Sequence, residues 1–312
     1  MFNIIFVLLF LPIKTFCYTL ITFDVDGTLV AGSGRAASEG AHARAFSHAV
    51  SNVLGNGAPI PPVSEALPRE LYHGSTDGLI LLRLAKATLN INSKESYPKL
   101  QDMFACMFQY INSMENDEIG EFISPLPGVI DQLKKLSNMK DEVICGLVTG
   151  NVEGIARRKM NAVGIFETNA LHPPCETQKK WDGTSHISFL GGFGSDYCSG
   201  DIDDVERNHL DRGEQIAIAT QRGENILGIN KKLKRVVHVG DAPADVLAAK
   251  WYSEAKTDND LCVGMVAVAT GSYTSNELRE LAGEAIPGQW EPVILDDGMA
   301  SDEFLNACGL KI

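Results

Sequence analysis

Apolar residues along the chain form short continuous runs, and stretches with helical spacing separate these runs. The runs predict buried strands at 18–24, 143–149, 236–241 and 263–270. The stretches with helical spacing predict helices at 129–138, 152–162 and 243–252. Strands that alternate with helices require parallel crossovers, so the pattern predicts an α/β fold with a doubly wound parallel sheet.

A long helical stretch separates the first predicted strand from the others. Its helical spacing is interrupted by the proline-rich segment APIPPVSEALP and by Asn/Ser clusters, which predicts helices at 35–54, 76–91 and 96–114. Because the remaining strands follow this stretch, we interpret it as an insertion that covers the sheet. The expected division is a core of residues 18–31 and 126–312 with a helical cap of residues 32–125.

Composition places the chain among ordinary globular proteins. Of its 312 residues, 45% are hydrophobic and 21% charged, and the formal net charge is −13. This negative charge disfavours nucleic acid or an anionic membrane surface as the main partner. A small anionic substrate is still compatible, because backbone amides and a metal can reverse the field locally. The GGFGSD run at 191–196 predicts a glycine-rich loop, which alone indicates little about phosphate binding.

The N-terminal residues leave the localisation open. The apolar run at 4–11 is too short for a stable membrane span but has the length of a signal-peptide core. No positive charge precedes it, no small-x-small site follows it, and a predicted strand begins at residue 18. We therefore favour a cytoplasmic protein and keep residues 1–17 as an alternative organellar or secretory targeting segment. The seven cysteines are scattered without a CxxC pair, which favours reduced structural thiols.

The first predicted strand ends in two closely spaced carboxylates. In DVDGT, Asp24 and Asp26 are two residues apart, and Gly27 allows the chain to curl back over the strand end. Two such carboxylates repel each other unless a divalent cation lies between them or one side chain turns aside. The motif therefore predicts a site for a hard metal ion, with an ordinary Asp-Gly turn as the alternative.

Polar residues also follow two later strands. In VTGN, Thr149 supplies a hydroxyl, while Gly150 and Asn151 lead into a helix whose free N–H groups can hold a phosphate oxygen. In GDAPAD, Asp241 ends a strand and Asp245 lies one helical turn later. Carboxyl ends of parallel strands meet at one crevice, so these residues should lie beside the first carboxylate pair. The alternatives are a plain helix cap and a first-turn acid favoured by the helix dipole.

DVDGTLV, LVTGN and VVHVGDAPADVLAA resemble motifs one, two and four of the haloacid dehalogenase-like hydrolase superfamily. The resemblance implies a Rossmann-like core with a helical cap inserted after the first motif. It implies that Asp24 is a nucleophile that forms an aspartyl-phosphate and that Asp26 is the general acid and base. Mg²⁺ would be held by the Asp24 carboxylate, the backbone carbonyl of Asp26 and Asp241, with Asp245 ordering these ligands.

The resemblance also implies a phosphate-binding hydroxyl and a basic residue of a third motif. Thr149 matches the hydroxyl, and Gly150 and Asn151 would be further phosphate contacts. Lys159 in ARRKMNAVGIF matches one branch of the family, although no clear KP follows it. The alternative for this lysine is a solvated basic helix face. The competing basic residues are Arg157, Arg158, Lys180 and Arg207.

Within the predicted cap, LYHGSTDGLI resembles the GxTD segment of phosphoglycolate phosphatase-like members. This resemblance implies substrate contacts at Arg35, His73, Thr76 and Asp77. The alternative is that Thr76 and Asp77 cap the following helix and that His73 is a surface loop residue.

The implied function is a Mg²⁺-dependent phosphatase that hydrolyses a small phosphorylated metabolite. The second aspartate of the first motif disfavours dehalogenase and ATPase-pump chemistry. A phosphomutase of the same superfamily is one alternative. A phosphonatase is another, and it would need a Schiff-base lysine such as Lys86, Lys94 or Lys99. A non-catalytic binding protein on this fold is a third, against which the intact set of acids argues.

Overall fold

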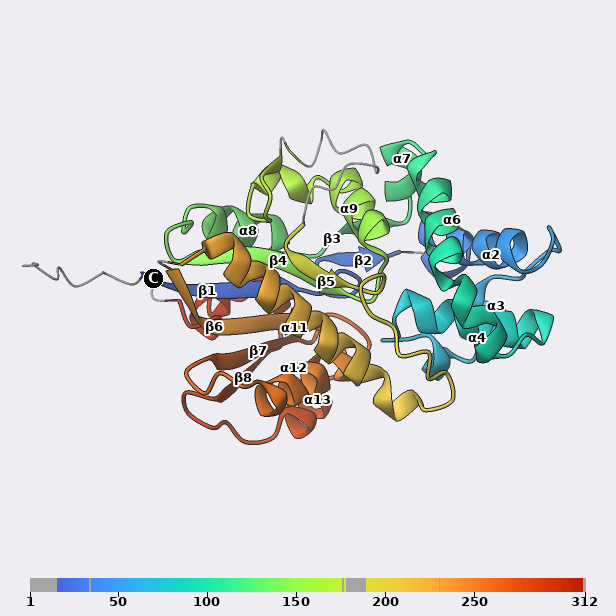
Figure 1. Ribbon diagram of the computed structural model, residues 1–312. Helices are drawn as coiled ribbons and strands as arrows, with labels where there is room; N and C mark the ends of the chain where they lie inside the picture. The colour runs from blue at the N-terminus through green and yellow to red at the C-terminus, as the bar shows by residue number, and fades with distance from the viewer. Residues whose placement is uncertain (1–15, 34, 176, 178–188, 230, 311–312) are drawn as a thin grey trace, which may run out of the picture.

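The computed structural model describes residues 16–33, 35–175, 177, 189–229 and 231–310 (Figure 1). Lys180 and nearly all of the predicted targeting segment 1–17 lie outside these residues. Within the described ranges, no helix has the length and apolar character needed to cross a membrane.

A sheet of six parallel strands forms the centre of the molecule, in the order β5-β4-β1-β6-β7-β8 (Figure 1). The strands are β1 (Phe16–Phe23), β4 (Val143–Thr149), β5 (Gly191–Phe193), β6 (Lys231–Gly240), β7 (Cys262–Val268) and β8 (Trp290–Leu295). Phe23 at the end of β1 pairs with Leu147 of β4 and with Val239 of β6. The carboxyl ends of the three central strands therefore lie level, and the predicted parallel α/β fold is confirmed.

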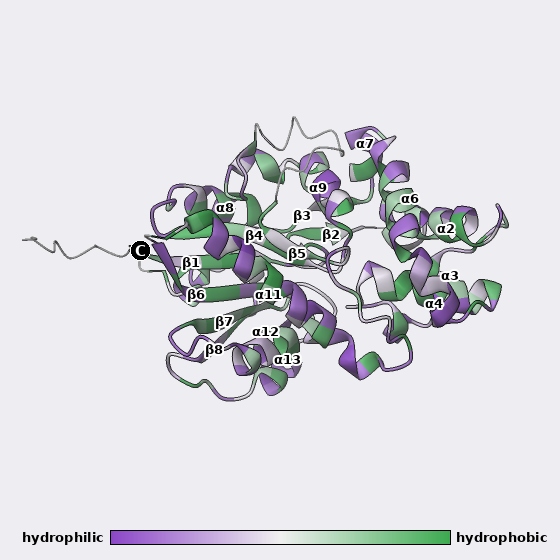
Figure 2. Cartoon of the chain, in the orientation of Figure 1, coloured by the Kyte–Doolittle hydropathy of each residue, from purple (hydrophilic) through white to green (hydrophobic). Residues whose placement is uncertain are grey.

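Helices cover both faces of this sheet. One face packs against α8 (Val129–Ser137), α9 (Glu153–Ala162) and α14 (Phe304–Ala307). The other packs against α11 (Asn208–Leu227), α12 (Pro243–Ala255) and α13 (Ser275–Ala282). The central strands are apolar on both faces, as the predominantly green strands in Figure 2 show. This pattern is expected for a parallel sheet that helices bury on both sides.

A helical insertion leaves the core through a two-stranded ribbon, in which β2 (Val30–Gly32) pairs antiparallel with β3 (Ile123–Pro125). Between them lie α1 (Ala36–Glu39), α2 (Ala41–Val53), α3 (Val63–Ala66), α4 (Asp77–Leu89), α5 (Ser93–Ser96), α6 (Leu100–Asn112) and α7 (Asn116–Gly120). These helices have an apolar core of their own, which continues onto Val152 and Ile155 of the sheet domain. The insertion thus packs directly on the start of α9. The domain boundaries given above stay a prediction.

The structure differs from the predicted elements in a few places. The predicted helix 35–54 is divided at Gly40, whose backbone is extended rather than helical. The GGFGSD run contains the short edge strand β5, where the sequence pattern predicts only a loop. The helix α11 was not predicted, because its buried face includes Asp211, Arg212 and Gln215, which break the apolar spacing.

Candidate active site

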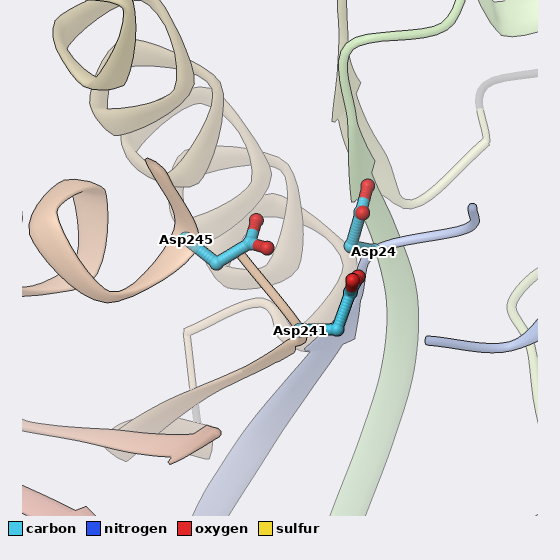
Figure 3. A group of neighbouring side chains, drawn as sticks. All are labelled: Asp24, Asp241 and Asp245. Atoms are coloured by element: carbon cyan, nitrogen blue, oxygen red, sulfur yellow. The ribbon is translucent and has the colours of Figure 1, made fainter. Parts of the chain in front are cut away.

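Three buried aspartates meet at the carboxyl end of the sheet (Figure 3). Asp24 follows β1, Asp241 follows β6, and Asp245 lies in the first turn of α12. One carboxylate oxygen from each lies within 4.8 Å of the other two. Gly27 has a φ of +90°, and a Cβ at that position would overlap the carboxylate of Asp241. The glycine therefore lets the loop after β1 approach the end of β6.

The cluster carries more negative charge than its surroundings compensate. Burial, together with the charges of Asp245 and Asp24, raises the pKa of Asp241 to about 8. Burial raises the pKa of Asp24 to about 6, against the lowering effect of Arg212. Burial also acts on Asp245, but Arg212 and a hydrogen bond from His238 hold the pKa of this carboxyl well below its usual range.

This donor set fits a divalent cation. Carboxylate oxygens are the ligands preferred by hard cations, and a cation would relieve the repulsion between Asp24 and Asp241. Both oxygens of Asp245 are already engaged, one by Arg212 and His238 and the other by the Ala242 N–H at 3.0 Å. Asp24 and Asp241 would therefore be the ligands, and Asp245 is fixed by its protein partners.

Arg212 supplies the positive charge at this cluster, and the sequence analysis missed it. Its side chain is 5% exposed, and Nη1 lies 3.4 Å from Oδ2 of Asp24 while pairing with Oδ1 of Asp245. Burial opposes its charge, but the neighbouring carboxylates raise the pKa of Arg212 above its usual value. The arginine follows no strand and belongs to no recognised motif. A signal was present in the polar side chains on the otherwise apolar face of α11.

A second group of charged side chains, Lys159 and Asp26, lines the same cavity as the aspartates. Lys159 of α9 donates from Nζ to both oxygens of Asp26, at 2.8 and 2.7 Å, and to Oδ1 of Asn151 at 2.8 Å. Asn151 in turn donates to Oδ2 of Asp26 at 3.0 Å. The side chain of Asp26 is 48% exposed. Partial loss of solvent acts to raise its pKa, but the charge of Lys159 and the hydrogen bonds from Lys159 and Asn151 outweigh this effect and lower the pKa to about 2. Lys159 thus pairs directly with Asp26.

The other basic candidates within the described residues lie elsewhere. Arg157 pairs with Glu153 at 3.1 Å, and Arg158 donates to the carbonyl oxygen of Met114 at 2.6 Å. Arg207 is exposed in the short helix η4 (Val205–Arg207). Lys159 is therefore the one among them that reaches the acidic residues.

His42 on α2 connects the insertion to this charged pair, and sequence reasoning did not find it. Its Nδ1 lies 2.9 Å from Nζ of Lys159, and its Nε2 lies 3.1 Å from Oδ2 of Asp77. An ammonium group can only donate, so Nδ1 is the acceptor and the proton is on Nε2. The same oxygen of Asp77 accepts the backbone N–H of Val152 at 2.8 Å. Insertion and core thus share one hydrogen-bond chain that ends at Asp26.

The remaining predicted residues occupy different positions. Thr149 is buried with its hydroxyl 3.4 Å from the Asn151 N–H, and the carbonyl of Gly150 accepts the Asp77 N–H at 2.8 Å. Thr76 is the N-cap of α4, as the alternative interpretation held, and accepts the Leu79 N–H.

Of the two remaining candidates in the insertion, His73 lines the cavity and Arg35 does not. His73 lines the cavity beside the aspartates, where burial and Arg69 lower its pKa. Arg35 does not line this cavity. Its side chain is 72% exposed and pairs with Glu39 at 2.7 Å.

A cavity of about 500 Å³ lies between the sheet end and the insertion. Its lining brings together most of the residues that the sequence had singled out, namely Asp24, Asp26, His73, Asp77, Thr149, Gly150, Asn151, Lys159 and Asp241. Arg212 and His42 line it as well. A cavity of this size suits a small-molecule ligand.

Comparison with known proteins identifies the class. The sequence matches the haloacid dehalogenase-like hydrolase family over residues 18–252, so the chain belongs to this family and the prediction is confirmed. No match was found among curated proteins.

Solved structures with similarity to the chain include three bacterial proteins. A hydrolase from Pseudomonas syringae is 17% identical, with a TM-score of 0.47 over 92% of this chain and 98% of that one. CbbY from Rhodobacter sphaeroides, in complex with phosphate, is 15% identical, with a TM-score of 0.49 over 93% and 99%. A predicted phosphoglycolate phosphatase from Haemophilus somnus is 15% identical, with a TM-score of 0.43 over 93% and 97%.

Proposed function

We propose that the protein is a Mg²⁺-dependent phosphatase that hydrolyses a small phosphomonoester, with Asp24 as the nucleophile. The observation that carries this proposal is the position of Asp24, whose buried carboxylate meets Asp241 in the same cavity that Asp26 and Lys159 line. Family membership supports hydrolase chemistry, and the buried acids fit the metal.

In the first step, an oxygen of Asp24 attacks phosphorus and the ester bond to the leaving oxygen breaks, which forms an aspartyl-phosphate. Arg212 holds the Asp24 side chain and stabilises its ionised form. A magnesium ion bound by Asp24 and Asp241 would neutralise charge on the phosphoryl oxygens. Lys159, Asn151 and Thr149 line the same cavity and would contact the transferred group.

Asp26 would move the protons. Its low pKa makes it ionised when no substrate is bound. A carboxylate with so low a pKa is a weak base, so this role requires the negative charge of the bound phosphate to raise the pKa of Asp26. Asp26 would then take the proton that a monoanionic phosphate ester carries and pass it to the leaving oxygen. In the second step, it would take a proton from the water that attacks the aspartyl-phosphate.

The test is release of inorganic phosphate from p-nitrophenyl phosphate by the full chain, with Mg²⁺ and with excess chelator. We expect turnover only with Mg²⁺ and none in Asp24→Asn, because an amide cannot form the acyl-phosphate. The matched control is Asp196→Asn, which removes a carboxylate that pairs with Arg222 outside the cavity lining. Turnover in chelator, or in Asp24→Asn at a rate near wild type, would contradict the proposal.

A further inference from the structure

The cavity has two chemically different ends. The core contributes Asp24, Asp26 and Asp241 and, among the described residues, both lysine and arginine side chains of the lining, Lys159 and Arg212. The insertion contributes a wall of apolar side chains, which are Phe46, Ile80, Ile111 and Ile119. These side chains are all at most 7% exposed, so the wall is an ordered part of the insertion's own core. A bound phosphate ester with its phosphoryl group at Asp24 would direct its leaving group toward this wall.

Among the described residues, those that the insertion contributes to the cavity lining carry no positive charge for a second anionic group. Within the described residues, its contribution to the cavity lining includes no lysine or arginine, and its one charged side chain is the acidic Asp77. Arg44 pairs with Glu118 at 2.8 Å and Lys86 with Asp203 at 2.7 Å, and none of these four residues lines the cavity. Arg69 and Arg83 do not line it either, but each donates to a lining serine, Arg69 to Ser272 and Arg83 to Ser75 at 2.8 Å. Arg83 also donates to Ile202 and Asn208.

The two histidines that line the cavity, His42 and His73, do not supply the missing positive charge. Both ring nitrogens of His42 are occupied by protein partners, Nδ1 by Lys159 and Nε2 by Asp77, so this ring presents no free donor to a ligand. Burial and the nearby Arg69 lower the pKa of His73, which favours its neutral form. Lys159 and Arg212 are already paired with Asp26 and with Asp24 and Asp245, and they face the transferred phosphoryl group.

We infer that the leaving group of the substrate is an uncharged alcohol with an apolar body, and not one that carries a carboxylate or a second phosphate. This inference rests on the proposed phosphatase function. An anionic leaving group would lose its hydration at a wall that offers no cation, and Asp77 would repel it. An apolar leaving group would instead gain from leaving water.

The experiment compares two esters that differ only at the far end of the leaving group. In n-pentyl phosphate the chain ends in methyl, and in 5-phosphooxypentanoate it ends in a carboxylate. That carboxylate is too distant from the ester oxygen to alter its basicity much, so the intrinsic reactivities are matched. With Mg²⁺ and the full chain, we expect kcat/KM to be at least about tenfold higher for the pentyl ester.

A variant of the apolar wall gives an independent measurement. Ile80→Arg would place a cation on the wall and should shift the ratio toward the carboxylate ester by about tenfold. Ile80→Met, of similar length without charge, should leave the ratio unchanged. The wild-type ratio decides the inference even if Ile80→Arg does not fold.

The possible results separate the inference from the function on which it rests. A wild-type ratio near one, or one that favours the carboxylate ester, would overturn the inference while leaving the phosphatase function in place. No phosphate release from either ester or from p-nitrophenyl phosphate would overturn the proposed function, and the inference with it.

Discussion

Nη1 of Arg212 lies 3.4 Å from Oδ2 of Asp24, and both side chains are almost completely buried. The same guanidinium pairs with Asp245, so one arginine from α11 compensates two of the three carboxylates at the end of the sheet. Asp241 is left with the hydroxyl of Thr28, at 3.1 Å, as its hydrogen-bond donor. The arrangement combines a fixed cation of the chain with one carboxylate that a metal ion would neutralise.

Arg212→Gln should destabilise the protein and make it more dependent on Mg²⁺. Removing one partner of a buried ion pair costs about 3–5 kcal/mol, because the remaining carboxylates are left uncompensated. A bound cation would offset part of this loss. We therefore expect a lower free energy of unfolding in chelator and a larger Mg²⁺-induced rise in Tm than in the wild type.

The matched control for this variant is Arg222→Gln on the same helix. Arg222 pairs with Asp196 at 2.7 Å, away from the acidic cluster, and its side chain is partly exposed. Its loss should cost no more than about 1 kcal/mol and leave the Mg²⁺ effect unchanged. Equal responses of the two variants to Mg²⁺ would show that Arg212 does not compensate the cluster.

Stability of the metal-free protein should fall as the pH rises. The pKa of Asp241 is raised to about 8 from a usual value of 3.8, so the folded state keeps a proton that the unfolded state has lost. Since the folded state binds more protons between these values, unfolding becomes easier with increasing pH. Mg²⁺ takes the place of the proton, so its stabilising effect should grow over the same range.

Melting curves at about pH 5 and pH 8, in chelator and in Mg²⁺, measure both effects. Asp241→Asn, which carries no titrating group at this position, serves as the control and should show a weaker dependence on pH and on Mg²⁺. An equal Mg²⁺-induced shift at the two pH values would contradict the expectation.

His42→Ala should slow turnover more than it weakens substrate binding. The variant removes the acceptor that orients Lys159 toward Asp26 and the donor that satisfies Asp77. Since small misplacements of catalytic groups cost up to about 10²-fold, we expect kcat to fall by about 10- to 100-fold with a smaller change in KM. His48→Ala is the control, because His48 lies on the same helix outside the cavity lining, where its half-buried ring stacks on Tyr110. A change confined to KM would indicate that His42 only contacts substrate.

The sequence predicted the parts of the site that follow strands. Asp24, Thr149 and Asp241 each end an apolar run, and parallel strands of similar register necessarily bring such ends together. Family resemblance added Lys159, whose place in α9 no strand pattern indicates.

The residues that the sequence did not reveal come from helices packed across the site. Arg212 reaches the site from the first turns of α11, which packs on one face of the sheet, and His42 reaches it from α2 of the insertion, and neither is adjacent to a motif. The sequence also could not show which aspartate pairs with Lys159, because Asp24 and Asp26 are only two residues apart. The choice depends on the direction of each side chain in the loop after β1, and in the structure Asp26 is the one that contacts Lys159 of α9.

Asp26→Asn should separate proton transfer from nucleophilic attack. The amide cannot carry the proton to the leaving oxygen, while Asp24 and Asp241 are unaltered and still able to hold the metal. General acid-base assistance is worth about 10²- to 10⁴-fold, so loss of this magnitude is expected for n-pentyl phosphate, whose leaving oxygen needs a proton. For p-nitrophenyl phosphate, whose leaving oxygen hardly needs one, the first step should slow much less.

The measurement is the single-turnover rate of alcohol release, as the ratio of wild type to Asp26→Asn for each ester. Asn151→Ala is the control, because it removes a hydrogen bond to Asp26 and keeps the carboxylate. It should slow both esters by similar factors. The second step of Asp26→Asn should also slow, since the attacking water has lost its base, so with p-nitrophenyl phosphate in excess over enzyme p-nitrophenol should appear as a burst. Equal ratios for the two esters would remove Asp26 from proton transfer, and its contact with Lys159 would then be structural.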